Sequence, residues 1–155
     1  MVRLSRMTDY AVVILCQMAR EPGTAVFTAP YLAEATGLPQ PTASKLLKIL
    51  AQKGILRAQR GAYGGYGLAR PPESISARDI VLALEGPVTL TACVEGGEGS
   101  CNFELSCPIR GHWDPVNEAI HRALAEVSLA EMAARRPIFV GHLAGTVLSE
   151  RRGAE

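Results

Sequence analysis

Three of the four cysteines stand close together in the sequence, at Cys93, Cys101 and Cys107. Thiolates ligate soft metals and carry redox chemistry. The intervening gaps of seven and five residues do not match structural zinc, whose cysteine pairs usually lie two to four residues apart. A glycine-rich loop with widely spaced thiolates can instead surround an iron–sulfur cluster. We therefore expect an iron–sulfur cluster here, with a zinc site, a thiol redox switch and inert cysteines as alternatives.

Three thiolates leave one ligand position of such a cluster to another group. The nearby candidates are Glu98, Glu104 and His112. A mixed ligand set makes a cluster more labile, which suits a sensor better than an electron carrier. The fourth cysteine, Cys16, lies among apolar residues and is expected in the core. No special role is expected for His121 or His142.

The charge of the chain is divided unevenly between its two halves. Residues 1–70 hold nine Lys and Arg against three acids, a net of +6, whereas residues 71–155 hold seven against twelve, a net of −5. The two sums give the net charge of +1 for the whole chain. A basic half joined to an acidic half predicts that the basic half binds a polyanion.

Within the basic half, residues 30–53 are expected to form two helices joined by a short turn. Pro30 suits the first turn of a helix that ends near Thr36, and Gly37 permits the turn. The second helix runs from Thr42 to about Lys53. This spacing is typical of a helix-turn-helix, whose second helix enters the major groove of DNA. The polar and basic residues near its start are the candidate contacts to bases and phosphates: Gln40, Thr42, Ser44, Lys45 and Lys48.

Residues 55–68 change from helical to alternating character and contain four glycines. Glycine permits positive φ, so the stretch predicts a β-hairpin with a loop. A hairpin directly after a helix-turn-helix is a wing. Arg60 and Tyr63 are the candidate DNA contacts near its tip, because an arginine there suits the narrow minor groove.

The other elements complete a fold that is mainly α with a small hairpin. Thr8 is expected to cap a helix over 9–20, and Ser76 with Asp79 has the form of a capping box. The predicted organisation is a winged helix-turn-helix domain (1–72), a connecting helix (73–92), a cysteine-rich cluster-binding loop (93–114), a long dimerisation helix (115–136) and a tail (137–155). A helix of this length leaves an apolar stripe that a partner subunit usually covers.

Several classes of function are disfavoured by what the sequence lacks. No apolar run approaches the roughly 20 residues of a membrane span, and the N-terminus has no apolar signal core. We therefore expect a cytoplasmic protein without a membrane partner. No phosphate loop, Ser-His-Asp pattern or neighbouring pair of catalytic carboxylates points to an enzyme.

Further motifs are Arg3-Leu4-Ser5, Thr8-Asp9-Tyr10-Ala11, the wing sequence over 60–66 and Leu84-Glu85-Gly86-Pro87. With the three loop cysteines they resemble the winged-helix iron–sulfur regulators of the IscR and NsrR type over about residues 1–135. The segment from Cys107 to Trp113 looks most like that of regulators of the SUF iron–sulfur assembly system. The resemblance implies a homodimeric bacterial transcription factor with the long helix as its dimer element. It also implies one cluster per subunit, commonly [2Fe–2S].

The resemblance also implies roles for individual residues. Cys93, Cys101 and Cys107 match the cluster cysteines, Pro41, Thr42, Ser44 and Lys45 match the recognition helix, and Arg60 matches the wing. IscR-type proteins have a histidine ligand three residues after the last cysteine, where this chain has Arg110, and arginine does not ligate iron. NsrR-type proteins use an aspartate from the first helix of the partner subunit, which corresponds to Asp9. His112 lies two residues from the IscR position, so Asp9, His112 and another group such as water or a thiol all remain candidates.

We therefore expect a homodimeric repressor that binds a double-stranded DNA operator, senses iron–sulfur or redox status and controls iron–sulfur assembly genes. Gain or loss of the cluster would shift the loop and the base of the long helix, and so change the angle between the two DNA-reading helices. The alternative is a cluster-free regulator of thiol redox state or cysteine metabolism on the same scaffold.

Overall fold

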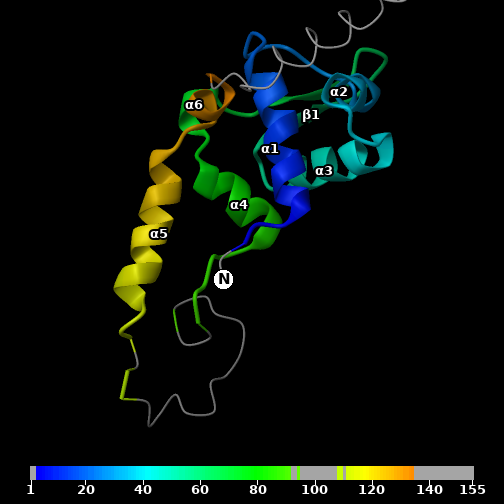
Figure 1. Ribbon diagram of the computed structural model, residues 1–155. Helices are drawn as coiled ribbons and strands as arrows, with labels where there is room; N and C mark the ends of the chain where they lie inside the picture. The colour runs from blue at the N-terminus through cyan, green and yellow to red at the C-terminus, as the bar shows by residue number, and fades with distance from the viewer. Residues whose placement is uncertain (1–2, 92–93, 95–107, 110, 135–155) are drawn as a thin grey trace, which may run out of the picture.

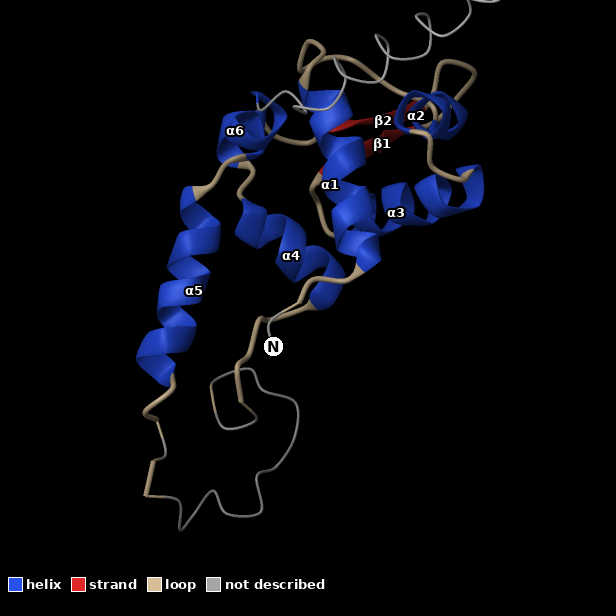
Figure 2. Ribbon diagram, viewed as in Figure 1, coloured by secondary structure: helices blue, strands red, loops and turns tan. Residues whose placement is uncertain are grey.

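The computed structural model describes residues 3–91, 94, 108–109 and 111–134 (Figure 1). Its helices are α1 (Arg6–Ala19), α2 (Ala29–Thr36), α3 (Gln40–Gln52), α4 (Ala77–Glu85), α5 (Asp114–Glu126) and α6 (Leu129–Ala134), with a single 3₁₀ turn at Pro72–Ser74. The strands β1 (Leu56–Gln59) and β2 (Gly65–Leu68) form one antiparallel hairpin (Figure 2). The expected fold class, mainly α with a small hairpin, is confirmed.

One hydrophobic core holds the N-terminal half of the chain together. It is formed by the apolar faces of α1, α2 and α3 and by the ends of the hairpin, with Ile14, Leu32 and Leu47 completely buried. The same core continues past the expected boundary at residue 72, because Ile80 of α4 and Leu129 of α6 belong to it. Helix α6 packs against α1, so movements of the C-terminal helices act directly on the helix that supports α2 and α3.

The start of α1 differs from the prediction that Thr8 is its cap. Ser5 is the N-cap, and its side chain accepts a hydrogen bond from the Thr8 backbone N–H. Thr8 is fully buried inside the helix, and its hydroxyl donates to Glu85 at the end of α4. Ser5 and Thr8 both have hydroxyls suited to capping. Thr8 lies inside the helix because its hydroxyl binds Glu85, which is 77 residues away in the sequence.

The cap predicted for the connecting helix is confirmed. Ser76 and Asp79 form a capping box at the start of α4, each side chain accepting from the other's backbone N–H. Arg70 forms an ion pair of 3.2 Å with Asp79. Burial tends to raise the pKa of Asp79, but the hydrogen bonds from Ser76 and the charge of Arg70 outweigh it, so the net shift is downward.

The prediction of a single long helix over 115–136 is wrong. Helix α5 ends at Glu126, and Val127 is extended. Ser128 caps α6 with Glu131: the Ser128 N–H donates to the Glu131 carboxylate at 2.8 Å, and the Glu131 N–H donates to Ser128 Oγ at 3.2 Å. The extended residues are also tied to the start of α4, because Ala77 donates to the Val127 carbonyl at 2.8 Å. The sequence Ser-x-x-Glu is a capping signature that the continuing apolar periodicity had obscured.

Candidate nucleic-acid interface

Helix α3 presents a polar side and a buried side, as a recognition helix must. Ala43, Leu46, Leu47 and Leu50 are fully buried and fix α3 against the core. Of the predicted DNA contacts, Gln40, Pro41, Lys45 and Lys48 are exposed, and Thr42 and Ser44 are half-buried. The six residues therefore lie on the side that the core leaves open, and a groove of DNA could reach them.

The N-terminal end of α3 has no side-chain cap. Its N-cap residue is Pro39, which forms no capping hydrogen bond. The first turn of a helix has backbone N–H groups without partners inside the helix, and the helix dipole favours an anion there. A DNA phosphate can accept from these groups. The turn before α3 is held by Gly37, which has φ of +70° and ends α2.

The hairpin expected after α3 is present, and its antiparallel strands pair with Leu56 opposite Leu68 and Gln59 opposite Gly65. The tip runs from Arg60 to Gly64, and a hydrogen bond of 3.0 Å from the Gly64 N–H to the Gly61 carbonyl closes it. Tyr63 in this tip is 92% exposed. Such an aromatic side chain is available to a ligand, because nothing in the described part of the chain covers it.

The wing glycines serve two different purposes. Gly61 has a φ of +110°, which allows the turn at the tip. Gly65 instead lies against the backbone of Phe27, where an added Cβ would lie 2.8 Å from the Phe27 carbonyl carbon. Phe27 and Tyr66 exchange two backbone hydrogen bonds of 2.8 Å across this contact. The wing is therefore anchored along its outer edge to the segment that leads into α2.

The cations on these elements have no acidic partners in the described part of the chain. The one ion pair among the described residues is Arg70–Asp79, so Lys45, Lys48 and Arg60 are free to bind phosphates. Helix α2, the start of α3 and the wing tip lie at the same end of the molecule, away from α5 (Figure 1). Together these features make a cationic surface of the shape and chemistry that a DNA duplex needs.

The predicted cluster ligands lie partly outside the described residues. Cys93, Cys101 and Cys107 are among the residues that the structure does not describe. Asp9 is exposed in the first turn of α1, and His112 is exposed two residues before α5. Among the described residues, no group of three or more His, Cys, Asp or Glu side chains could hold a metal ion.

Cys16 matches the expectation of a core cysteine. It is half-buried in α1 and packs against the core. Burial raises the pKa of the Cys16 thiol, and the nearby Arg20 only partly opposes that effect. A thiol held in its neutral form is a poor nucleophile and a poor metal ligand.

Asn117, which the sequence analysis did not name, and His121, for which it expected no special role, attach the chain before the cysteines to α5. The Asn117 side-chain oxygen accepts from the Leu90 N–H at 3.2 Å, and Asn117 is one of two buried polar residues in the described chain. His121 Nε2 lies 3.0 Å from the Val88 carbonyl. These side chains follow each other at i and i+4 on one face of α5. The spacing was visible in the sequence, but nothing local indicated that residues 88–90 return to this face.

A second attachment joins the start of α1 to the end of α4. Glu85 accepts from the Ser5 N–H at 2.8 Å and from the Thr8 hydroxyl. Hydrogen bonds from Ser5 and Thr8 lower the pKa of Glu85. The turn of α1 that carries Asp9 is thereby fixed next to the point where the chain leaves α4 toward the cysteines.

Comparisons with known proteins agree with this architecture. A family model described as "Rrf2: Iron-dependent Transcriptional regulator" matches residues 4–135. The HTH-type transcriptional regulator CymR of Bacillus subtilis is 27% identical over 132 residues, which cover 85% of this chain and 90% of CymR. A Synechocystis protein that is predicted to be an HTH-type transcriptional regulator is 37% identical over 131 residues, which cover 84% of this chain and 87% of the relative.

A solved structure is similar over most of the chain as well. T. potens IscR superposes with a TM-score of 0.61 at 27% identity, and the match covers 84% of this chain and 85% of that one. No helix in the described part of the chain is both long and apolar enough to span a membrane.

Proposed function

The chain belongs to the Rrf2 family of transcriptional regulators, and we propose on that premise that it is a homodimeric repressor whose operator affinity depends on an iron–sulfur cluster. As a family member it is a DNA-binding regulator and not an enzyme. The proposal adds the sensor, the subunit arrangement and the residues that perform each task. It also assigns iron–sulfur assembly genes as targets, on the resemblance of residues 107–113 to SUF regulators.

DNA contact is assigned to the start of α3 and to the wing. Gln40, Thr42, Ser44 and Lys45 would read base edges and phosphates in the major groove, and Lys48 would add charge at the backbone. Arg60 and Tyr63 at the wing tip would enter the adjacent minor groove. The unpaired cations and the uncapped end of α3 support this assignment.

The chemistry of the available side chains fits a cluster. Cys93, Cys101 and Cys107 supply three thiolates, the ligands that iron–sulfur clusters prefer. Asp9 and His112 are both exposed, and neither is bonded through its side chain to another described residue. One of them would be the fourth ligand, and Asp9 would come from the partner subunit. When bound, the cluster would supply a site that oxidation, nitric oxide or iron shortage can remove.

The attachment of both ends of the cysteine segment to α5 is the observation that carries the sensing proposal. The segment enters through residues 88–90, which Asn117 and His121 hold against α5. It leaves directly into the first turn of α5 at Asp114. A change in the conformation of this segment must therefore act on α5, whichever chemistry causes it. Helix α6 follows α5 and packs against α1 in the DNA-binding core.

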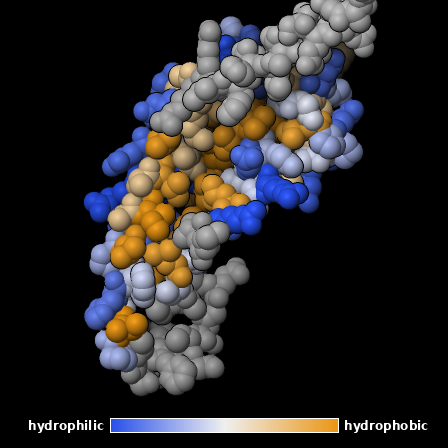
Figure 3. Space-filling view, viewed as in Figure 1, coloured by the Kyte–Doolittle hydropathy of each residue, from blue (hydrophilic) through white to orange (hydrophobic). Residues whose placement is uncertain are grey.

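Dimerisation is assigned to the apolar side of α5. Trp113, Val116 and Val127 are 40–45% exposed, and hydrophobic residues gather over this side of the molecule (Figure 3). Exposed apolar patches of this kind mark protein interfaces. Two-fold pairing would place two reading helices about 34 Å apart, which is one turn of DNA.

The experiment that tests the sensor is an anaerobic purification with an absorbance spectrum and an iron and sulfide assay. We expect visible absorbance in the native protein and its loss when Cys93, Cys101 or Cys107 is replaced by Ala. Cys16→Ala is the matched control, because Cys16 lies in α1 and should leave the absorbance unchanged. Operator DNA selected from a random library should then bind the cluster-loaded and cluster-free forms with different affinity. Colour retained in all three cysteine variants, or equal affinity of the two forms, would contradict the proposal.

A cluster-free thiol regulator is the second candidate. Arg110 stands where IscR-type proteins have a ligand histidine. B. subtilis CymR, to which this chain is 27% identical, has a solved structure described as that of the global cysteine regulator. On this reading the same three cysteines would report oxidation through thiol chemistry. Protein purified without air would then be colourless and free of iron, and oxidant treatment alone would change its operator affinity.

A further inference from the structure

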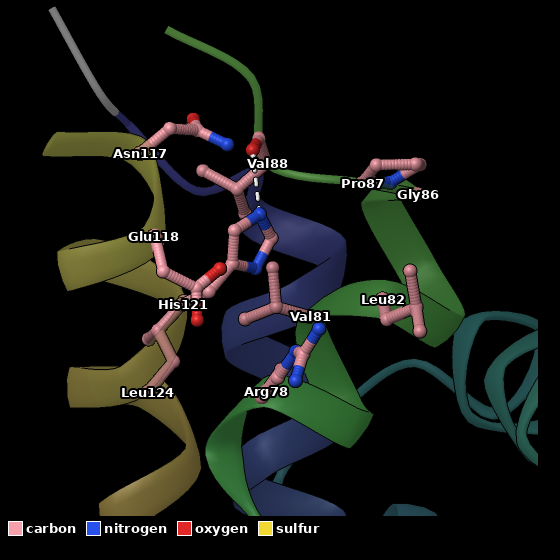
Figure 4. Close-up of a pocket in the computed structure, with 10 residues that line it drawn as sticks. All are labelled: Arg78, Val81, Leu82, Gly86, Pro87, Val88, Asn117, Glu118, His121 and Leu124. Atoms are coloured by element: carbon pink, nitrogen blue, oxygen red, sulfur yellow. Dashed lines mark hydrogen bonds between the residues drawn. The ribbon is translucent and has the colours of Figure 1, made fainter. Parts of the chain in front are cut away.

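A cleft of about 320 Å³ lies between α4 and α5 (Figure 4). Its walls are Arg78, Val81, Leu82, Gly86, Pro87, Val88, Asn117, Glu118, His121 and Leu124. A cleft of this size is at the lower end of the range for small-molecule sites. The assigned DNA contacts and cluster ligands are not among its lining residues.

Two opposite charges face this cleft from different helices. Arg78 belongs to α4 and Glu118 belongs to α5, and both are exposed at its opening. Neither side chain is paired, because the one ion pair of the described residues is Arg70–Asp79 and neither is otherwise bonded. A molecule that carries both a carboxylate and an ammonium group would satisfy both of them.

A third polar group points inward and lacks a partner. His121 Nε2 bonds the Val88 carbonyl at 3.0 Å, and since a carbonyl only accepts, this nitrogen is the donor. Nδ1 of the neutral ring is then an acceptor, and it is buried without a hydrogen-bond partner among the described residues. An unpaired buried acceptor costs free energy. A ligand N–H beside Glu118 could donate to it.

Apolar residues line the rest of the cleft beside Asn117. Val81 is buried, Val88 and Leu124 are half-buried, and Pro87 is exposed (Figure 4). This surface suits a short aliphatic side chain. We propose that the cleft binds a free amino acid with a small apolar side chain: its carboxylate pairs with Arg78, and its ammonium group pairs with Glu118 and His121 Nδ1.

An occupant of this cleft would touch the chain that leads to the cysteines. Val88 lines the cleft and is bonded to His121, and Leu90 is bonded to Asn117 two residues further on. A bound amino acid would hold α4, α5 and this segment together. Its effect on operator affinity rests on the proposed function, whereas the binding itself does not.

Binding is tested without DNA, by isothermal titration of the full-length protein with each of the twenty common amino acids. We expect at least one of those with a small apolar side chain to bind with a Kd below about 1 mM. Its methyl ester, which lacks the carboxylate, and its N-acetyl form, which lacks the ammonium group, should each bind at least about tenfold more weakly. No binding by any amino acid at about 10 mM would overturn the proposal.

Variants then identify the cleft as the place of binding. Arg78→Gln and Glu118→Gln each remove one charge from an exposed side chain, so both should fold normally and weaken binding by about tenfold. Arg122→Gln is the control, because Arg122 is also exposed on α5 but does not line the cleft. Native affinity in both cleft variants would also overturn the proposal.

A second titration separates this inference from the proposed function. Operator binding is measured with and without the amino acid that binds. A ligand effect that Arg78→Gln removes supports the regulatory role of the cleft. Amino-acid binding without any operator binding would contradict the assigned DNA interface, but it would still support the proposal that the cleft binds an amino acid.

Discussion

At the level of single residues, Arg60 is the side chain whose role is easiest to isolate. It is exposed at the wing tip and forms no ion pair with any other described residue. Its removal should therefore change DNA binding without changing the stability of the fold. We expect Arg60→Ala to weaken operator binding by about fivefold, or about 1 kcal/mol, and to make log Kd less dependent on log salt by about one unit of slope.

The measurement is a fluorescence-anisotropy titration at several salt concentrations, with thermal unfolding recorded in parallel. Arg122→Ala makes the same substitution on exposed α5 and should bind the operator as the native protein does. If Arg60→Ala leaves both the affinity and the salt slope unchanged, the wing does not contact DNA through this residue.

The protonation state of Glu85 affects the stability of the folded protein. Hydrogen bonds from Ser5 and Thr8 lower its pKa in the folded protein, so the folded state binds the proton more weakly than the unfolded state. The stability that these hydrogen bonds give is fully present above the ordinary glutamate pKa of about 4.3. It is lost as the pH falls through the lower pKa that Glu85 has in the folded state. Urea unfolding between about pH 5 and pH 3 should therefore show a smaller loss of stability for Glu85→Gln than for the native protein.

Glu73→Gln provides the reference for this pH series, because Glu73 is exposed in the 3₁₀ turn and forms no hydrogen bond with the described residues. Its unfolding should follow the native pH dependence. Identical curves for Glu85→Gln and the native protein would show that the contact from α4 to α1 does not contribute.

At the level of elements, the sequence predicts most of the DNA-binding half because each boundary has a local signal. Pro30 and Gly37 mark the boundaries of the two helices of the helix-turn-helix, and the structure places the helix ends within about two residues of those predicted. Ser76 and Asp79 form the predicted capping box for the same reason. Local sequence signals predict a helix boundary correctly where the contact that fixes the boundary lies within one helical turn.

The predictions fail where the deciding partner is distant in sequence. Ser5 rather than Thr8 caps α1 because Glu85 takes the Thr8 hydroxyl. The division between α5 and α6 depends partly on backbone bonds from Val127 and Leu129 to residues 75–77. Asn117 likewise gains its role only when residues 88–90 return to α5. The candidate contacts on α3 depend on no distant partner, and they lie on the side of the helix that the core leaves open.

The anchoring of the wing predicts unequal effects for two glycines. A Cβ at Gly65 would collide with the Phe27 carbonyl group, which is backbone and cannot rotate away. We expect Gly65→Ala to destabilise the protein by about 2 kcal/mol and to weaken operator binding, because the hairpin must move off its anchor. Urea unfolding and operator titration measure the two effects.

Gly23→Ala is the matched substitution, since an added Cβ at Gly23 meets no atom within 4 Å. Its stability should stay within about 0.5 kcal/mol of the native value. Equal stability of the two alanine variants would mean that the contact with Phe27 does not hold the wing.

At the level of the whole molecule, the two ends carry different chemistry. The free cations and the uncapped end of α3 lie at one end, and the apolar side of α5 lies away from it (Figures 1 and 3). This division allows two copies to pair through α5 while both reading helices remain open to one DNA duplex. Pairing would also be required for tight binding, because one copy neutralises few phosphates and reads one half-site.

Val116→Lys tests this arrangement. Val116 is 45% exposed on α5, so a lysine there should leave the single subunit folded but place a charge in the proposed interface. We expect sedimentation equilibrium to show a dimer for the native protein and a monomer for Val116→Lys. Operator affinity should fall by at least about 100-fold, because the second half-site no longer adds its binding energy.

Ala125→Lys is the control for Val116→Lys, because Ala125 is also exposed on α5 but lies nine residues from Val116, on the opposite side of the helix. It should remain dimeric and bind the operator as the native protein does. If Val116→Lys stays dimeric, another surface pairs the subunits, and α5 must transmit a signal within one subunit alone. If instead only Ala125→Lys becomes monomeric, the subunits pair through the opposite side of α5.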